Sequence, residues 1–143
     1  MKLRILLATL LFSSTPALAD DFIYLKCDAL TSLVTKQIST NQVEDKQMEE
    51  QRFVKVDVAN SRLKFNTGGW ENVTLANGVA SFKTNDVEGG LTIAGELMLE
   101  YSPPGRISIQ VQGTPMDDFF QAMSVKGTCQ SSDESSFVKA VGQ

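Results

Sequence analysis

Three hairpins that can be aligned residue by residue constrain the fold of this 143-residue chain more than any other feature of its sequence. In each of them, apolar and polar residues alternate on both sides of a turn, which is the period of a half-buried β-strand. Opposed residues of an antiparallel pair share a face, so a hairpin should bring its apolar residues together. The repeated pattern predicts an antiparallel all-β domain.

The first two hairpins turn at Asn60-Ser61 and at Asn77-Gly78. The second of these dipeptides is the strongest short hairpin signal, because both residues tolerate positive φ. A two-residue turn in the first hairpin predicts two inward pairs, Val58 with Leu63 and Val56 with Phe65. The second hairpin predicts two more, Leu75 with Ala80 and Val73 with Phe82.

The third hairpin is the longest and turns at residues 103–105, Pro-Pro-Gly. It predicts three inward pairs, Tyr101 with Ile107, Leu99 with Ile109 and Leu97 with Val111. Gly95 lies on the apolar face, where we expect a bend or a close approach of another backbone. Neighbouring hairpins of this kind favour an up-and-down barrel of about eight or nine strands over the alternative, a two-sheet sandwich.

The remaining segments complete the expected domain. We expect one strand that ends near Cys27, a second strand over residues 28–38, and a polar connection over 39–51 that has room for a short helix. Residues 131–143 are rich in serine and acidic side chains and are expected to form a flexible tail, in which a short apolar segment could dock.

The chain has two cysteines, Cys27 and Cys129, near opposite ends of the expected domain. Each lies on the apolar face of its strand, so we expect a disulfide that joins the first and last strands and closes the barrel. A bridge across 102 residues contributes roughly 4–5 kcal/mol in the chain-entropy model, before any strain is subtracted. The alternative is a pair of reactive or metal-binding thiols, which the absence of CxxC and of histidine makes weak.

The N-terminus has the layout of a secretory signal peptide. Two basic residues precede a short apolar run, and an Ala-Leu-Ala sequence ends at Ala19. We therefore expect a signal peptide over residues 1–19, a single β domain over 20–130 and a periplasmic or secreted location. The mature chain would hold 11 basic and 17 acidic residues, a net charge of −6. This acidity argues against binding to nucleic acid or to anionic lipid, and we expect a monomer that is not inserted in a membrane.

Few residues suggest catalysis. Without histidine there is no Ser-His-Asp or Cys-His arrangement, and no phosphate-binding loop is present, so we expect no catalytic residue, metal ion or cofactor. Asp117 and Asp118 are adjacent acidic residues in a loop before a strand, and they raise an alternative, a hydrolase that uses two carboxylates. Adjacent acidic residues in a turn are more often simply solvated.

Three aromatic residues are candidate contacts for a partner: Trp70, Phe119 and Phe120, each at a junction of loop and strand. An aromatic ring at a barrel rim is a favourable contact because binding buries it. Gly68-Gly69-Trp70 also matches the Gly-x-Trp element of lipocalins. A structural role, in which the three rings cap the core, is the alternative.

The leader, the Tyr-Leu-Lys-Cys strand and the closing Gly-Thr-Cys resemble small exported β-proteins of uncharacterised function from cyanobacteria and other Gram-negative bacteria. More loosely, the chain is similar to the disulfide-closed periplasmic barrels that inhibit lysozyme, although it lacks their Ser-Gly-x-x-Tyr motif. The absence of histidine, the absence of catalytic motifs and the small size favour a non-enzymatic binding module, for a small apolar ligand inside the barrel or for a protein or envelope partner outside it. The alternatives are a lysozyme-inhibitor type of protein and a carboxylate-dependent hydrolase.

Overall fold

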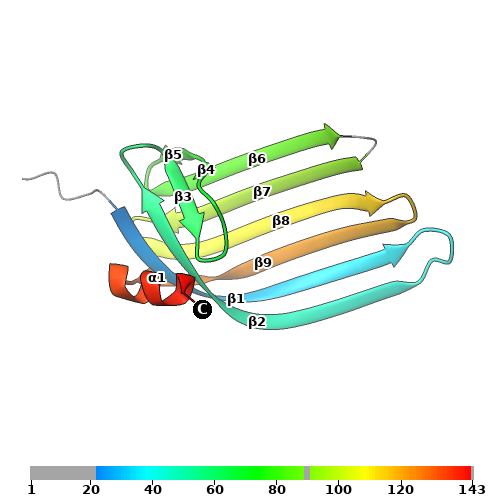
Figure 1. Cartoon of the computed structure of the whole chain (residues 1–143), viewed down its shortest axis with the longest axis horizontal. Helices are drawn as coiled ribbons and strands as arrows, with labels where there is room; N and C mark the ends of the chain where they lie inside the picture. The colour runs from blue at the N-terminus through cyan, green and yellow to red at the C-terminus, as the bar shows by residue number, and fades with distance from the viewer. Residues whose placement is uncertain (1–21, 89–90, 143) are drawn as a thin grey trace, which may run out of the picture.

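The computed structural model describes residues 22–88 and 91–142, which form one antiparallel sheet of nine strands and a C-terminal helix (Figure 1). The expected signal peptide, residues 1–19, lies outside the described residues. The elements in chain order are β1 (Phe22–Gln37), β2 (Val43–Asp57), β3 (Arg62–Phe65), β4 (Glu71–Asn72), β5 (Thr74–Ala76), β6 (Val79–Glu88), β7 (Leu91–Tyr101), β8 (Pro104–Met116), β9 (Phe119–Ser131) and α1 (Glu134–Val141).

The strand order is β4-β3-β2-β1-β9-β8-β7-β6-β5. Each strand therefore lies beside its sequence neighbour, except across the gap between β4 and β5, and β1 pairs with β9. This is an up-and-down, nearly closed barrel with its open seam between the two shortest strands. The predicted all-β class, barrel architecture and strand number are confirmed.

The disulfide lies on the strand pair that joins the two ends of the chain. Cys27 of β1 is directly opposite Cys129 of β9, and the two sulfur atoms are bonded. Both side chains are buried in the apolar core. The predicted Cys27–Cys129 bridge is confirmed, together with its inward position.

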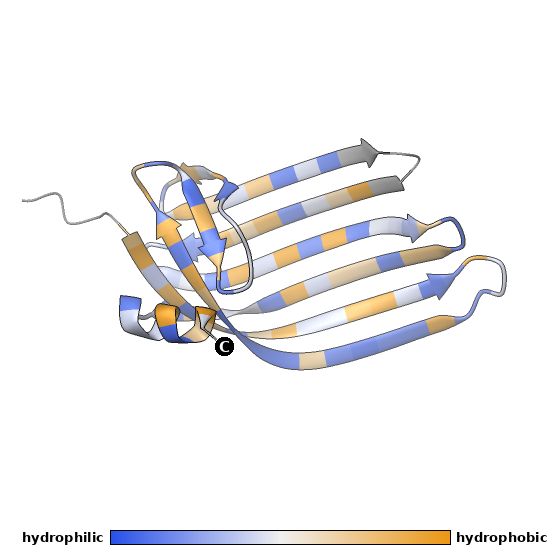
Figure 2. Cartoon of the chain, viewed as in Figure 1, coloured by the Kyte–Doolittle hydropathy of each residue, from blue (hydrophilic) through white to orange (hydrophobic). Residues whose placement is uncertain are grey.

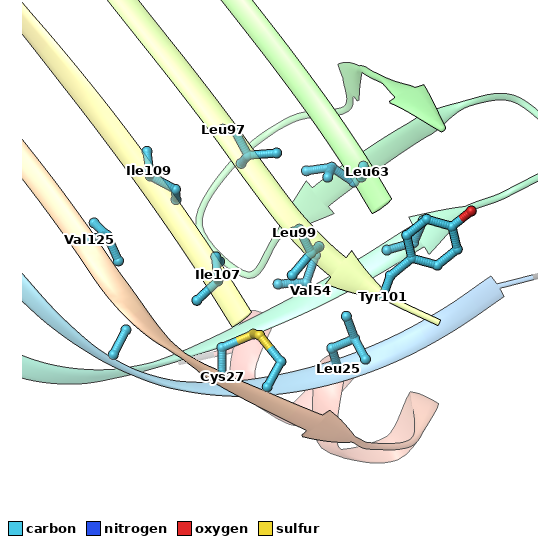
Figure 3. Packing of buried hydrophobic residues seen from close by; sticks show 14 residues of the cluster. Leu25, Cys27, Val54, Leu63, Leu97, Leu99, Tyr101, Ile107, Ile109 and Val125 are labelled. Atoms are coloured by element: carbon cyan, nitrogen blue, oxygen red, sulfur yellow. A yellow bond between two sulfur atoms is a disulfide. The ribbon is translucent and has the colours of Figure 1, made fainter. Parts of the chain in front are cut away.

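The core occupies one end of the barrel, where the short strands complete the wall (Figure 3). Leucine, isoleucine and valine side chains from six strands meet there, with Tyr101 at the edge. Leu25, Val54 and Leu99 are almost fully buried although they come from three different strands. Packing of these side chains from all around the wall leaves the interior of this end filled with protein.

The hairpin registers differ from the prediction in two cases out of three. The turn at Asn77-Gly78 is as predicted, with Leu75 opposite Ala80 and positive φ at both turn residues. The first hairpin instead pairs Val56 with Leu63, and Val58 lies outside the strand with 36% of its surface exposed.

A buried carboxylate explains the longer first turn. Asp57 accepts hydrogen bonds from the backbone and side-chain amides of Asn60 and from Nε of Arg62, so the loop has four residues between the paired positions. Burial opposes ionisation of Asp57, but the contacts from Arg62 and Asn60 outweigh it and lower the pKa of this carboxyl below its ordinary value.

The third hairpin is shifted in the same way. Leu99 lies opposite Ile107 rather than Ile109, and Leu97 lies opposite Ile109, because Tyr101 already pairs with Pro104 and the register shifts between Leu99 and Tyr101. The turn therefore sits one or two residues earlier than predicted. A shift of two residues keeps every side chain on its predicted face, so the inward set is unchanged.

Three further expectations need correction. Residues 28–38 do not form a separate strand, because most of them continue β1 without a break. Residues 43–51, expected as a connection, are the first part of β2. Figure 2 shows this part of β2 as mostly hydrophilic. It pairs only with β1, and a charged edge strand of this kind resists pairing with another chain.

The C-terminal segment, expected as a flexible tail, contains helix α1. Asp133 caps its N-terminus by accepting a hydrogen bond from the backbone of Ser136. Phe137 is buried, and its ring centre lies 5.9 Å from that of Tyr24. The docking of a short apolar segment in this region is confirmed for Phe137, whereas Val138 and Val141 are exposed.

Candidate functional site

The nine strands divide the molecule into two unequal parts. Strand β3 reaches only residues 54–57 of β2, and strand β5 reaches only residues 79–81 of β6, so the six longer strands continue beyond the barrel. We call the resulting six-stranded sheet the open half, and the rest the closed half. The open half consists of residues 32–37, 43–47, 83–88, 91–96, 110–116 and 119–124. No helix or second sheet among the described elements covers it (Figure 1).

A groove crosses five strands of the open half on the face opposite to the core. Two rows of side chains border it, and each row follows directly opposed positions from β6 to β1. The first row is Lys83, Glu96, Gln110, Ser124 and Ser32. The second row is Asn85, Ala94, Gln112, Ala122 and Val34. The residues between the rows, Gly95 among them, form the floor.

The size of the groove suits a ligand. Its volume is about 520 Å³, within the range of roughly 300–1,000 Å³ that is typical of ligand sites. Five strands about 4.8 Å apart make it roughly 19 Å long. Its side chains are small over β1 and β9, whereas glutamines stand over β8, and this difference in length hollows the surface.

The groove is electrically neutral. Among the described residues, the charged side chains that line it are Lys83 and Glu96, which form an ion pair with 3.5 Å between Nζ and Oε1. Amides and hydroxyls supply the other polar groups. Within residues 22–88 and 91–142, the side chains of Gln110, Gln112 and Ser124 make no hydrogen bond to the protein, so their donors and acceptors face solvent.

A second hollow of about 690 Å³ lies beside β1 and β2, nearer the closed half. Its lining includes Asp28, Glu49 and Lys126 around Leu30, which is 44% exposed. Leu30 points to the same face as Ser32, two positions along β1, so the two hollows follow one another on that face.

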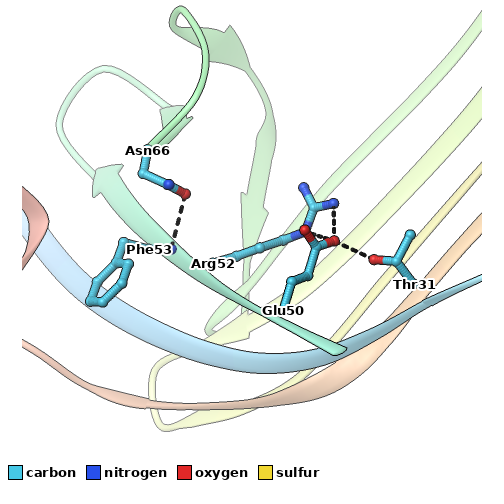
Figure 4. Close-up of polar contacts among 5 residues, drawn as sticks. All are labelled: Thr31, Glu50, Arg52, Phe53 and Asn66. Carbon is cyan, nitrogen blue, oxygen red and sulfur yellow. Dashed lines mark hydrogen bonds and ion pairs between the residues drawn. The ribbon is translucent and has the colours of Figure 1, made fainter. Parts of the chain in front are cut away.

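A polar cluster marks the boundary between the two halves on the core-facing side (Figure 4). Thr31, Glu50 and Arg52 are joined by hydrogen bonds, with 2.6 Å between Nη2 of Arg52 and Oε1 of Glu50. Burial opposes ionisation of Glu50, but the contacts from Thr31 and Arg52 outweigh it and lower the pKa of this carboxyl below its ordinary value. The cluster satisfies the polar groups at the end of the apolar core.

Trp70, the first predicted contact residue, lies in the closed half and belongs to a stacked cluster. Its ring stacks on Phe22 with 6.3 Å between ring centres, and the Arg62 guanidinium lies 4.3 Å from the Trp70 ring centre. Lys55 lies 4.0 Å from the ring centre of Phe22. Trp70 keeps 37% of its surface exposed, so one side of the cluster faces solvent.

Phe119 and Phe120, the other predicted contact residues, lie at the far tip of the open half. They pair with Gln37 and Lys36 at the end of β1, whereas Trp70 stacks near its start. Both phenylalanines are half-buried. The structure therefore does not bring the three aromatic residues together in one patch.

The turns at this tip carry exposed apolar residues, Ile38, Val43 and Met116. Asp118 links the two turns, because its carboxylate accepts hydrogen bonds from Gln37 and from the backbone and hydroxyl of Ser39 at 2.6–3.0 Å. These hydrogen bonds, that of the Ser39 hydroxyl above all, lower the pKa of Asp118 below its ordinary value. Asp118 thus joins two turns, which is a structural role.

The groove is the feature that sequence reasoning missed. Its lining residues are ordinary polar and small positions on the outward face of predicted strands, and nothing in their spacing marks them as a site. Only the register of five strands aligns them in two rows. The one available signal was the concentration of glutamine, serine and alanine on the outward positions of residues 108–124.

The described part of the chain contains no group of three or more acidic or cysteine side chains that could hold a metal ion. No helix among the described residues is long and apolar enough to cross a membrane. The chain matches no known protein family, and neither a curated protein nor a solved structure resembles it closely enough to count as a match.

Proposed function

We propose that the protein is an exported, non-enzymatic binding module that holds its partner on the outside of the open half. One observation carries this proposal: six long strands extend beyond the packed core as a sheet that no other described element covers, and a groove of ligand size crosses that sheet. On the core-facing side of this sheet, Val111 and Met123 pack partly against the apolar core, whereas the groove lies on the face that is open to solvent. A bare sheet with a hollowed face is therefore the part of this molecule best suited to contact something else.

A binding site outside the barrel is favoured over one inside it. Large side chains such as Leu97, Leu99 and Tyr101 occupy the interior of the closed half, as Figure 3 shows. A small apolar ligand would have to displace them, at a cost of packing energy. Export is proposed from the leader pattern and agrees with the Cys27–Cys129 bridge, since disulfides persist mainly in oxidising compartments.

A hydrolase that uses Asp117 and Asp118 is the weaker alternative. Asp118 already holds the turn between β1 and β2, which leaves its carboxylate engaged with Ser39 and Gln37. A pair of carboxylates that shares acid and base roles needs one group kept protonated, whereas the contacts of Asp118 lower its pKa.

Native mass spectrometry of the protein isolated from its own periplasm tests the proposal. We expect a co-purifying molecule whose release leaves the fold intact. A variant that fills the groove, Ala122→Leu, should lose this molecule, whereas Trp70→Ala should retain it. Recovery of the bare protein only, from a periplasm in which it is abundant, would contradict a binding role. If Trp70→Ala loses the molecule and Ala122→Leu keeps it, the binding site lies in the closed half and the proposed location is wrong.

A further inference from the structure

The chemistry of the groove narrows the class of ligand, and this inference rests on the proposed function. The groove presents amides from Asn85, Gln110 and Gln112 and the hydroxyls of Ser124 and of Ser32, the latter also donating to Asp45 at 3.4 Å. Each primary amide offers donors and acceptors side by side, and each hydroxyl both donates and accepts. Such groups match a ligand whose own polar groups are hydroxyls.

Charge argues against an ionic ligand. Lys83 and Glu96 pair with each other, so an incoming phosphate, carboxylate or ammonium group would find no unpaired counter-charge among the groove-lining residues. The protein as a whole is acidic, which further disfavours anions. The ligand should therefore be neutral.

The floor argues against an extended peptide. The groove runs across the strands, and its floor residues Gly95, Val111 and Met123 pair with one another across the β-ladders. A peptide that lies across the strands finds no unpaired backbone groups there and cannot add itself as a strand. Recognition must come from side chains alone.

The second row supplies apolar contact between its amides. Ala94, Ala122 and Val34 alternate with Asn85 and Gln112 along this side of the groove, and all three are half-buried. A sugar ring has this same mixed character, with hydroxyls at its rim and C–H groups on its faces. We propose that the groove binds a neutral, linear oligosaccharide segment, with Gln110 and Gln112 as its main polar contacts.

The test is an amide NMR titration of the disulfide-bonded protein, residues 20–143, with three neutral probes: maltohexaose, laminarihexaose and N-acetylchitohexaose. Each is added to about 10 mM, where even a site with a Kd of about 1 mM is mostly occupied. With at least one probe, we expect saturable shifts of the side-chain amides of Gln110 and Gln112 and of the backbone of Gly95.

Variants of the groove-lining residues test whether the oligosaccharide binds in the groove. Loss of one neutral hydrogen bond lowers affinity by roughly 3–10-fold, so Gln112→Ala should weaken binding by that factor and the double variant with Gln110→Ala by more. Ala122→Leu should abolish binding by filling the groove. Gln130→Ala is the matched control, because Gln130 is an exposed glutamine of the same face of β9 in the closed half.

Two outcomes would overturn the inference: no shift with any of the three probes, or equal affinity in the glutamine variants and the control. A molecule captured in native mass spectrometry that binds equally well to the Ala122→Leu variant would also overturn it, while leaving a binding function in place. The two proposals can thus fail separately.

Discussion

Leu25 and Leu33 lie on the same face of the same strand, β1, yet their environments differ. Leu25 is 1% exposed among side chains from the whole barrel wall, whereas Leu33, in the open half, is only half-buried. The difference comes from β3, β4 and β5, which complete the wall beside Leu25 and end before they reach Leu33. Stability is therefore concentrated in the closed half, and the open half is a surface supported by it.

The largest expected effect on stability comes from a substitution to asparagine in the core of the closed half, compared with the same substitution in the open half. Leu99→Asn puts an unsatisfied polar group in the core and removes a fully buried side chain, which costs about 4 kcal/mol or more and is comparable to the whole stability of a small domain. Ile93→Asn, at a position 46% exposed on the core-facing side of β7, should cost about 1 kcal/mol or less. Urea unfolding followed by circular dichroism measures both. Equal losses would show that the open half shares the core.

Removal of the bridge should rank second. The double variant Cys27→Ala with Cys129→Ala removes the covalent link between the first and last long strands, β1 and β9, and we expect a loss of about 2–5 kcal/mol in the free energy of unfolding. Thermal and urea unfolding with and without a reductant provide the measurement. The reductant should destabilise the wild-type protein and leave the double variant unchanged; an unaffected wild-type protein would argue against this contribution.

Substitutions of two glycines, one in each half, should change the stability by smaller amounts. A Cβ on Gly127, in the closed half, would lie 2.7 Å from Cα and 2.8 Å from Cβ of Ala29, so the β1 backbone must shift. We expect Gly127→Ala to cost about 1–3 kcal/mol. A Cβ on Gly95, in the open half, would lie 3.3 Å from Cγ2 of Thr84 and in ordinary contact with Cγ2 of Val111 at 3.7 Å, so Gly95→Ala should change stability by about 0.5 kcal/mol or less. A larger loss of stability in Gly95→Ala than in Gly127→Ala would mean that the open half is the more tightly packed one.

The smallest effect concerns the tip of the open half. Because hydrogen bonds lower the pKa of Asp118 below its ordinary value of 3.8, the ionised carboxylate stabilises the folded tip. This contribution is fully present above pH 3.8 and is lost as the pH falls through the lower folded pKa. We expect faster amide exchange at Ser39 in that range, and at neutral pH in Asp118→Asn, with no change in global unfolding. Asp117→Asn is the control; equal exchange in the two variants would refute the role of Asp118.

The alternation of apolar and polar residues was enough to predict the class, the barrel, the strand number and, with the exception of Val58, the inward residues of the three hairpins. It was enough because the period of two survives an error of two residues in register, as the hairpins at Asp57 and Tyr101 demonstrate. The cysteine pairing followed from the same alternation, since Cys27 and Cys129 both fall on inward positions of the terminal strands.

Tertiary structure alone decided where the strands end and what they leave uncovered. Residues 43–51 are too polar to signal a strand, and they form one because β1 offers an edge for their backbone. Trp70 and Phe119 look equivalent in sequence but lie near opposite ends of β1. The groove exists only where five strands align Gln110 and Gln112 with distant residues, and such long-range register depends on the packing of the closed half, which no local pattern records.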